Sequence, residues 1–413
     1  MNKKNFTISA LLFSLALNAA KAEAPLQTLI EVKNPLNIDR LQEPVAIDVD
    51  KILSPHSAGK VRNLQVSVYD GNTLLCSQLD DFDGDGTPDE LAFLLDIKAN
   101  ETKAVRLTMY DGAQPPCAEN RVHAQLFLRE KETGKITPTL LAASSSGNLY
   151  NSLQHHGPAW ETELIGYRAY FDQKQTIDVY GKYQRRLELS ECLWYPSDEQ
   201  LAQGFGDDVL LVSGTVGVGT FKGWDGAKAL HIAPVSNRAA YIAAAGPLRT
   251  VVDMSVEGWE YMNDSLNIIN RFITYAGQRT VEVRIVGGKP FANDVQFCTG
   301  VQKIIGTEEF FSDNAGLVCT WGNGFPVGDT VKYGKQTVGL AVAVPANVYN
   351  GDAESRVDHL TLLKPKSGSE FKYHFWAVSE KETWWNVKTA KAFFEYSAKE
   401  KHLRLNPLVV EVK

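Results

Sequence analysis

An alternation of apolar and polar residues with a period of two runs through most of this chain and limits the folds that it can adopt. The segments that alternate, or that carry apolar runs rich in β-branched residues, are 61–70, 90–97, 103–111, 207–221, 279–288 and 336–344. Such a pattern is typical of strands that are buried on one or both faces. Helical periodicity is confined to residues 198–202 and 385–398. We therefore predict an all-β protein.

A stretch rich in turn-forming residues divides the chain at 112–124. It contains a glycine and two consecutive prolines, which end strands and favour a linker. We predict a small N-terminal β-sandwich over residues 25–112. The remaining block, residues 125–413, is too long for one ordinary sandwich and favours a large antiparallel double-sheet domain that carries the site.

The N-terminus has the pattern of a secretory signal peptide. Lys3 and Lys4 precede an apolar stretch at 6–16, and Ala20-Lys21-Ala22 supplies small residues for cleavage. We predict a signal peptide over residues 1–22 and a periplasmic or secreted protein. Removing its three lysines changes the net charge from −7 to −10. No later apolar stretch reaches about 18 residues, so we expect no membrane span. The chain also lacks the clustered Lys and Arg that a nucleic-acid partner requires.

The 5 cysteines are widely spaced and form no CxxC motif, which argues against a zinc site. Their odd number leaves at least one thiol free or paired between chains. Cys298 and Cys319 can close a disulfide across neighbouring strands, although burial as two free thiols fits the sequence equally well.

The densest group of titratable residues lies at 155–172, in the segment HHGPAWETELIGYRAYFD. Alternation places Arg168, Tyr170 and Asp172 on one strand face, and the Gly157-Pro158 turn sets the histidines at a loop edge. The alternative is a salt-bridged sheet face with a histidine capping a turn. The candidate catalytic residues are His155, His156, Glu161, Glu163, Tyr167, Arg168 and Tyr170.

These residue types suit β-elimination from a uronate sugar. An Arg or His neutralises the carboxylate, a Tyr or His removes the adjacent proton, and a Tyr or His returns a proton to the leaving oxygen. Glu161 and Glu163 also leave two-carboxylate glycoside hydrolysis open.

Further polar and aromatic residues are candidates for substrate binding. Arg249 follows a Gly-Pro turn and Arg279 precedes a strand, whereas His231 lies in an apolar run and fits a core position as well. The candidate binding residues are Trp160, Asp172, Trp224, His231, Arg249, Arg279 and Glu282.

The acidic segment DDFDGDGTPDE at 80–90 matches the first half of an EF-hand calcium loop. Asp81, Asp83 and Asp85 alternate before a glycine, but the twelfth position is Ala92 rather than glutamate. Asp89 can substitute, as in shortened calcium loops. The alternatives are a structural Ca²⁺ site and an acidic turn between two strands. We expect that no cofactor is required for activity.

Three of these segments, 155–182, 246–288 and 80–97, resemble a family of secreted proteins from gut Bacteroidota that is known only as a domain of unknown function. The resemblance runs over about residues 30–410 and rests on a His-His-Gly…Glu…Tyr-Arg-x-Tyr-x-Asp motif. It implies a companion of glycan-degrading enzymes in polysaccharide utilisation loci, beside pectin-type lyases and unsaturated-uronide hydrolases. The large β block is similar to the galactose-mutarotase-like supersandwich of several polysaccharide lyases. Such a fold alone does not determine function.

The first of three functional hypotheses is a lyase that acts on uronate-containing glycans. There, Tyr170 or Tyr167 and His155 or His156 handle the protons, and Arg168 holds the carboxylate. The second is a hydrolase of uronide oligosaccharides that uses Glu161, Glu163 or Glu282 as acid and base. The third is a sugar-binding or mutarotase-like module without catalysis. All three expect an oligosaccharide or polysaccharide partner, and none fixes the oligomeric state.

Overall fold

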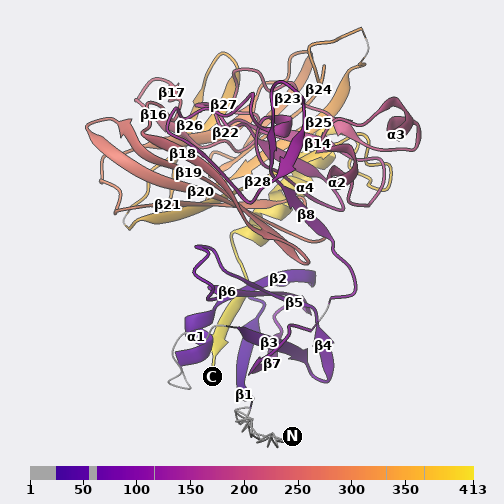
Figure 1. Cartoon of the computed structure of the whole chain (residues 1–413), viewed down its shortest axis with the longest axis vertical. Helices are drawn as coiled ribbons and strands as arrows, with labels where there is room; N and C mark the ends of the chain where they lie inside the picture. Colours follow the sequence, from indigo (N-terminus) through magenta and orange to yellow (C-terminus); the bar gives the residue numbers. More distant parts are fainter. Residues whose placement is uncertain (1–24, 55–62, 116, 332, 367) are drawn as a thin grey trace, which may run out of the picture.

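The computed structural model describes residues 25–54, 63–115, 117–331, 333–366 and 368–413, and it consists of a small β domain packed against a much larger one (Figure 1). The all-β prediction is confirmed, because the chain forms several antiparallel sheets. The predicted signal peptide at 1–22 lies outside the described residues. Within the described ranges, no helix has the length and apolar character needed to cross a membrane.

The small domain is a sandwich of two antiparallel sheets. One sheet has the strand order β29 (Val409–Val412), β1 (Leu26–Lys33), β7 (Thr102–Asp111), β3 (Leu64–Asp70) and β4 (Thr73–Leu75). The other has the order β2 (Arg40–Asp48), β6 (Glu90–Ile97) and β5 (Ser77–Asp80), and helix α1 (Val49–Leu53) follows β2. Since β29 pairs with β1, with Val412 opposite Ile30, the end of the chain returns to this domain. The large domain, which we placed at 125–413, therefore ends before residue 409.

The large domain is built on a nine-stranded antiparallel sheet. Its strand order is β11 (Leu141–Ser144), β18 (Asn237–Ala245), β19 (Arg249–Tyr261), β20 (Asp264–Tyr275), β21 (Val281–Gly287), β28 (Glu370–Ser379), β25 (Gln336–Ala343), β24 (Leu317–Gly324) and β23 (Thr307–Ser312). Helix α4 (Ala390–Arg404) packs on β24 and β25. Phe393 of α4 packs directly on Gly339 of β25, and a Cβ atom added to Gly339 would lie 2.9 Å from the Phe393 ring.

Two five-stranded sheets and the nine-stranded sheet share one large apolar core. The first has the order β15 (Asp207–Asp208), β14 (Ile177–Gly181), β13 (Gly166–Ala169), β12 (Ala159–Thr162) and β8 (Val122–Gln125). The second has the order β17 (Ala229–Leu230), β16 (Lys222–Trp224), β22 (Phe297–Gln302), β27 (Asp358–Leu363) and β26 (Tyr349–Glu354). Tyr167, Phe272 and Phe297 come from the three sheets and are all buried in this core. Alternating apolar residues thus produce the layered sandwich.

Two of the predicted elements differ in the structure. Residues 207–221 form a strand only at β15, because Gly217 and Gly219 adopt positive φ and break the extended backbone. The helix predicted at 385–398 begins later, at Ala390, where the Thr389 side chain accepts a hydrogen bond from the Ala392 amide. Trp385 lies in the loop before α4 and packs against the apolar cluster that contains Phe393. Its spacing therefore matches the helical pattern although it lies outside the helix.

A buried polar network joins the two domains. The guanidinium of Arg249, on β19, is fully buried and pairs with Asp80 and with Glu90, whose Oε2 lies 2.7 Å from Nη1. Gln78 of β5 accepts hydrogen bonds from the amides of Leu248 and Arg249 at 2.8 and 3.1 Å and donates to the Arg249 carbonyl. These contacts fix the edge of the nine-stranded sheet against the small domain.

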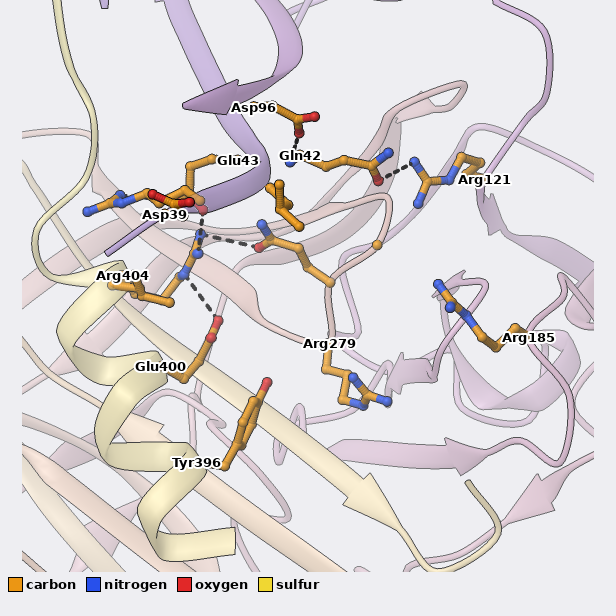
Figure 2. A pocket seen from close by; sticks show the side chains of 15 residues that line it. Asp39, Gln42, Glu43, Asp96, Arg121, Arg185, Arg279, Tyr396, Glu400 and Arg404 are labelled. Carbon is orange, nitrogen blue, oxygen red and sulfur yellow. Dashed lines mark hydrogen bonds and ion pairs between the residues drawn. The ribbon is translucent and has the colours of Figure 1, made fainter. Parts of the chain in front are cut away.

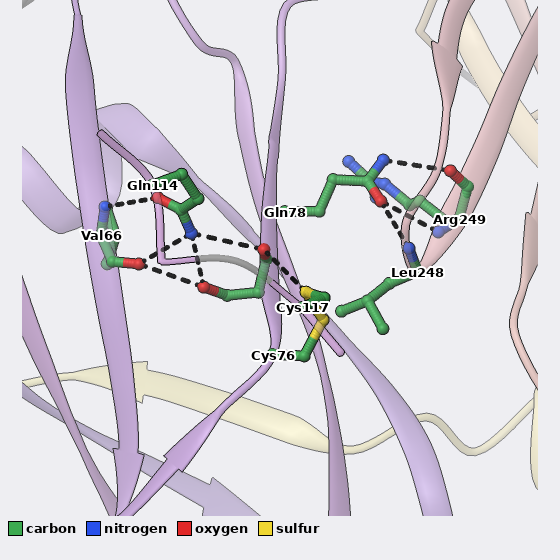
Figure 3. Close-up of a disulfide and its surroundings, with 8 residues drawn as sticks. Val66, Cys76, Gln78, Gln114, Cys117, Leu248 and Arg249 are labelled. Carbon is green, nitrogen blue, oxygen red and sulfur yellow. Dashed lines mark hydrogen bonds between the residues drawn. A yellow bond between two sulfur atoms is a disulfide. The ribbon is translucent and has the colours of Figure 1, made fainter. Parts of the chain in front are cut away.

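A disulfide between Cys76 and Cys117 holds the interdomain linker against the small domain (Figure 3). Nearby, the Gln114 side chain accepts from the Val66 amide at 3.1 Å and donates to the Ser77 hydroxyl at 2.7 Å. Cys192, Cys298 and Cys319 are free and buried, so of the two alternatives for Cys298 and Cys319 the structure has the buried free thiols and not the bridge. Both thiols lie in the apolar interior, in different clusters of the large domain.

We predict that the double substitution Cys76→Ser/Cys117→Ser lowers the free energy of unfolding by about 2–4 kcal/mol, because the bridge restricts the unfolded chain. Urea unfolding of both proteins under non-reducing conditions measures this. Three thiols of the wild type should react with a thiol reagent only after unfolding. Equal stability of the two proteins, or five reactive thiols in the unreduced unfolded chain, would contradict the prediction.

Candidate functional site

Strand pairing brings an arginine and an aspartate together in the large domain, on the outer face of the sheet formed by β15, β14, β13, β12 and β8. Arg168 on β13 lies directly opposite Asp178 on β14 in the antiparallel register. Tyr167 and Val179, which neighbour them in sequence, point into the core. Cross-strand partners have adjacent side chains. The guanidinium therefore meets the carboxylate, with Arg168 Nε 3.0 Å and Nη2 2.6 Å from Asp178 Oδ2.

The same arginine contacts a second carboxylate. Arg168 Nη2 lies 3.0 Å from Oδ2 of Asp208, which belongs to β15. Burial and the negative charge of Asp178 raise the pKa of Asp208 well above its usual value, although Arg168 opposes this shift. Burial opposes the charge of Arg168, but the two aspartates outweigh it and raise the pKa of the guanidinium. The site therefore places two carboxyl groups beside one guanidinium, and the pKa of Asp208 is raised there.

Aromatic rings surround this ion pair. Arg168 lies over the rings of Trp194, Tyr170 and Tyr195, at 4.4, 4.8 and 5.6 Å from their centroids. It donates to the hydroxyls of Tyr170 and Tyr195 at 2.7 and 2.8 Å. We call the following residues the Arg168 cluster: Tyr150, His156, Arg168, Tyr170, Asp178, Trp194, Tyr195 and Asp208.

The solvent side of the Arg168 cluster is a stack of partly exposed rings. Tyr150 stacks on His156 with centroids 3.9 Å apart, and Tyr170 stacks on both. Tyr195 is 48% exposed. Since the Tyr150 carbonyl can only accept, His156 Nδ1 carries the proton that it donates over 2.9 Å. Burial lowers the pKa of His156, so the imidazole stays neutral at pH 7.

Four of the predicted catalytic residues pack inside the domain instead of facing solvent. Glu161 pairs with the buried Lys182 and accepts from the amides of Glu188 and Leu189. The Tyr167 hydroxyl donates to the Arg279 carbonyl at 2.7 Å. The other two are His155, which contacts Phe127 and Gln125, and Glu163, which binds Arg121. Trp160, which we expected to bind substrate, also lies in the core and stacks on Phe272.

Asp172 and His231 both lie near Lys222 of β16, the strand that also carries Trp224. Asp172 Oδ1 accepts from the amides of Lys174 and Gln175 and so caps a turn. His231 is exposed, and its Nδ1 lies 3.3 Å from Nζ of Lys222. Burial lowers the pKa of Lys222 to about 8. Trp224 is buried, and its backbone bonds to the Tyr261 hydroxyl.

Glu163, Arg249, Arg279 and Glu282 lie apart from the Arg168 cluster, at or near the junction between the domains. Arg279 is bound to Glu382 and lies over the Trp385 ring at 3.9 Å. Although burial opposes its charge, Arg284 holds the pKa of Glu282 well below its usual value. The predicted residues thus divide between two places, the outer sheet face and the domain junction.

A cavity of about 490 Å³ opens at that junction (Figure 2). It lies between β2 and β6 of the small domain and the 277–279 turn and helix α4 of the large one. Its charged lining residues are Asp39, Arg40, Glu43, Asp96, Arg121, Arg185, Arg279, Glu400 and Arg404. Arg121 joins both domains, since it bonds to Glu163 at 2.5 Å and to Gln42 at 2.9 Å.

In the acidic loop between β5 and β6, carboxylate oxygens of Asp81, Asp83 and Asp89 lie within 4.8 Å of one another. Asp85 is outside this group, and its Oδ1 accepts from the Thr87 amide. Asp81 accepts from the amides of Gly84 and Gly86. An acidic turn explains these contacts as well as a cation does, so calcium binding stays a prediction.

Five residues of the Arg168 cluster were not predicted from the sequence, namely Tyr150, Asp178, Trp194, Tyr195 and Asp208. For Asp178 a signal was present, since the turn at 172–176 makes a hairpin in which it lies on the same face as Arg168. Trp194, Tyr195 and Asp208 reach the site through a segment with two short helices, α2 (Leu189–Cys192) and α3 (Asp198–Ala202). No local pattern in that segment indicates where it folds.

Comparison with known proteins gives a family and two distant structures. A family model described as a domain of unknown function (DUF4861) matches residues 32–410. No protein with a curated description matches the chain. A glycosyl hydrolase family 38 protein from Enterococcus faecalis has a TM-score of 0.44 and 9% identity, over 94% of this chain and 47% of that one. An α-mannosidase from the same species has a TM-score of 0.41 and 9% identity, over 94% and 46%. The chain spans about half the length of these structures, and similarity at this level carries no argument about function.

We predict that His155 makes the protein less stable as the pH falls from about 6.5 toward 3. Burial lowers the pKa of His155 to about 3, and Arg168 adds to the shift. The imidazole therefore stays neutral in the folded protein while the unfolded chain binds a proton, which costs up to about 1.4 kcal/mol per pH unit. Urea unfolding between pH 7 and pH 4 should give a shallower pH dependence for His155→Asn than for the wild type. Identical slopes would contradict this prediction.

Proposed function

This chain belongs to the DUF4861 family, and we propose that it is a lyase that cleaves a uronate-containing glycan by β-elimination at the Arg168 cluster. The observation that carries the proposal is a neutral, partly exposed His156 and an Asp208 of raised pKa in the surroundings of the same arginine. Two such groups supply a proton acceptor and a proton donor at neutral pH.

His156 is the proposed base. Its Nδ1 proton is used in the hydrogen bond to the Tyr150 carbonyl, so the lone pair is on Nε2. Within the part of the chain that the structure describes, Nε2 has no hydrogen-bond partner. Tyr170, by contrast, donates to Asp178 at 2.9 Å, and burial together with this carboxylate raises its pKa. Tyr170 therefore keeps its proton and fits the base role poorly.

Asp208 and Tyr195 are the proposed donors. The Asp208 side chain is 13% exposed, whereas Asp178 is nearly inaccessible beneath Arg168. Arg168 is already paired with Asp178, so it does not hold the substrate carboxylate directly. It donates to the Tyr195 hydroxyl, which leaves the tyrosine proton free for the carboxylate of a uronate. Arg168 is thus a positioning residue.

The proposed step balances with these groups alone. His156 Nε2 accepts the proton from C5 of the uronate, the C4–O bond breaks, and a C4=C5 double bond forms. Asp208 gives its proton to the departing oxygen. Hydrolysis with two carboxylates fits less well, because Asp178 is buried and Glu161 and Glu163 are engaged in ion pairs.

We predict that His156→Ala and Asp208→Asn each lower kcat on a polygalacturonate-type substrate by about 10²–10⁴-fold, because each removes a proton-transfer group. The measurement is the ultraviolet absorbance of the unsaturated product. The control is His402→Ala, which removes an exposed histidine of α4 and should leave the rate unchanged. Reducing ends formed without new absorbance would show hydrolysis and reject the lyase.

A sugar-binding module without catalysis is the second candidate, and the stacked, partly exposed rings of Tyr150, His156 and Tyr170 favour it. Aromatic faces flanked by polar groups suit sugar rings. In that case calorimetry should detect glycan binding that weakens in Tyr195→Ala, while no glycan of a uronate library is turned over by the wild type.

We also propose a periplasmic or secreted location. The Cys76–Cys117 disulfide supports it, because such bonds persist mainly in oxidising compartments. The observation bears on the small domain and does not depend on the reaction at the Arg168 cluster.

A further inference from the structure

The cavity at the domain junction has an uneven distribution of charged groups. Figure 2 shows Arg121, Arg185 and Arg279 on one side of it, and Asp39, Glu43 and Glu400 on the other. Most of these groups are engaged in ion pairs within the protein, and the remaining polar atoms are the ones available to bind a ligand.

Three of the four acidic residues that line the cavity are paired with cations of the protein. Glu43 bonds to both Arg40 and Arg404, at 3.2 and 2.9 Å. Glu400 lies 3.1 Å from Arg404, and Asp39 pairs with Lys98. Asp96 accepts a hydrogen bond from the backbone amide of Gln42 at 2.7 Å. Among the described residues, it is the acidic lining residue that has no cation partner.

The arginine side keeps unused donors. Arg185 is exposed and has no hydrogen-bond or ion-pair partner in the described part of the chain. Gln42 and Gln278 each accept through the side-chain oxygen, from Arg121 and Arg404, which leaves both amide nitrogens free to donate. The Tyr396 hydroxyl keeps its proton, since burial raises its pKa.

Free donors around one unpaired guanidinium suit a ligand with several acceptor oxygens. Arginine binds carboxylates through two parallel hydrogen bonds, and amide and hydroxyl donors suit the oxygens of a sugar ring. A volume of about 490 Å³ is large enough for a sugar-sized molecule. We propose that the cavity between the domains binds a sugar acid, whose carboxylate is held by Arg185 and whose hydroxyls meet Gln42, Gln278 and Tyr396.

This site is separate from the Arg168 cluster and does not depend on the proposed reaction. It has a consequence for stability, because a ligand that contacts β2, the 277–279 turn and α4 at once binds only when the two domains are packed together. Such a ligand raises the unfolding temperature by an amount that grows with the ratio of its concentration to its Kd.

The test measures galacturonate binding by calorimetry in a Tyr195→Ala background, which removes the ligand donor of the Arg168 cluster. We expect binding with a stoichiometry of one that weakens at least 10-fold when Arg185→Ala is added. The matched control is Arg356→Ala, which removes an exposed arginine outside this cavity and should not change binding. Galactose, which lacks the carboxylate, should bind at least 10-fold more weakly.

Three outcomes would overturn the proposal. They are equal binding of galacturonate and galactose, undiminished binding in the Arg185→Ala protein, and inorganic phosphate binding more tightly than galacturonate. Thermal unfolding with and without galacturonate gives a second readout, in which the ligand should raise Tm unless Arg185 is replaced. Loss of lyase activity would leave these measurements unaffected, so failure of the proposed function and failure of this site are distinguishable.

Discussion

The buried pair of Arg168 and Asp178 organises one whole face of the large domain. Removing one partner of such a pair leaves an uncompensated charge and costs about 3–5 kcal/mol. The same guanidinium contacts Asp208 and the rings of Tyr170, Trp194 and Tyr195. Burial and the negative charge of Asp178 raise the pKa of Asp208, and Arg168 opposes this shift. The structural ion pair thereby contributes to the raised pKa of the partly buried carboxyl group beside it.

The domain junction rests on a different buried arginine. Arg249 pairs with Asp80 and Glu90, and Gln78 bonds to its backbone. Arg284 also bonds to Glu90, at 2.7 Å, so two arginines from the nine-stranded sheet share one carboxylate of the small domain. Buried groups of this kind favour a single relative orientation of the two domains. A ligand cavity at the junction needs such an orientation, since its walls come from both.

Local pattern was sufficient for much of the fold and for part of the site. Alternation located β6, β7, β21 and β25, and helical periodicity located α3, because these elements form from residues close in sequence. It failed at 207–221, where glycines at positive φ interrupt an apolar run, and at β29, whose partner β1 lies at the other end of the chain. The same limit applied to the site. Arg168 and Tyr170 were found from their own strand, while Tyr195 and Asp208 are brought there by tertiary folding.

The segment between β14 and β15 connects the two places where the predicted residues gather. It supplies Arg185 to the cavity at the domain junction, and Trp194 and Tyr195 to the Arg168 cluster. Its start is fixed by the buried pair of Lys182 with Glu161. Glu161 also accepts the amides at the beginning of α2, so a glutamate expected to be catalytic instead anchors this segment. The many titratable residues of 155–172 therefore include one with a structural role, because the buried Glu161 of β12 holds in place the loop that carries Arg185, Trp194 and Tyr195.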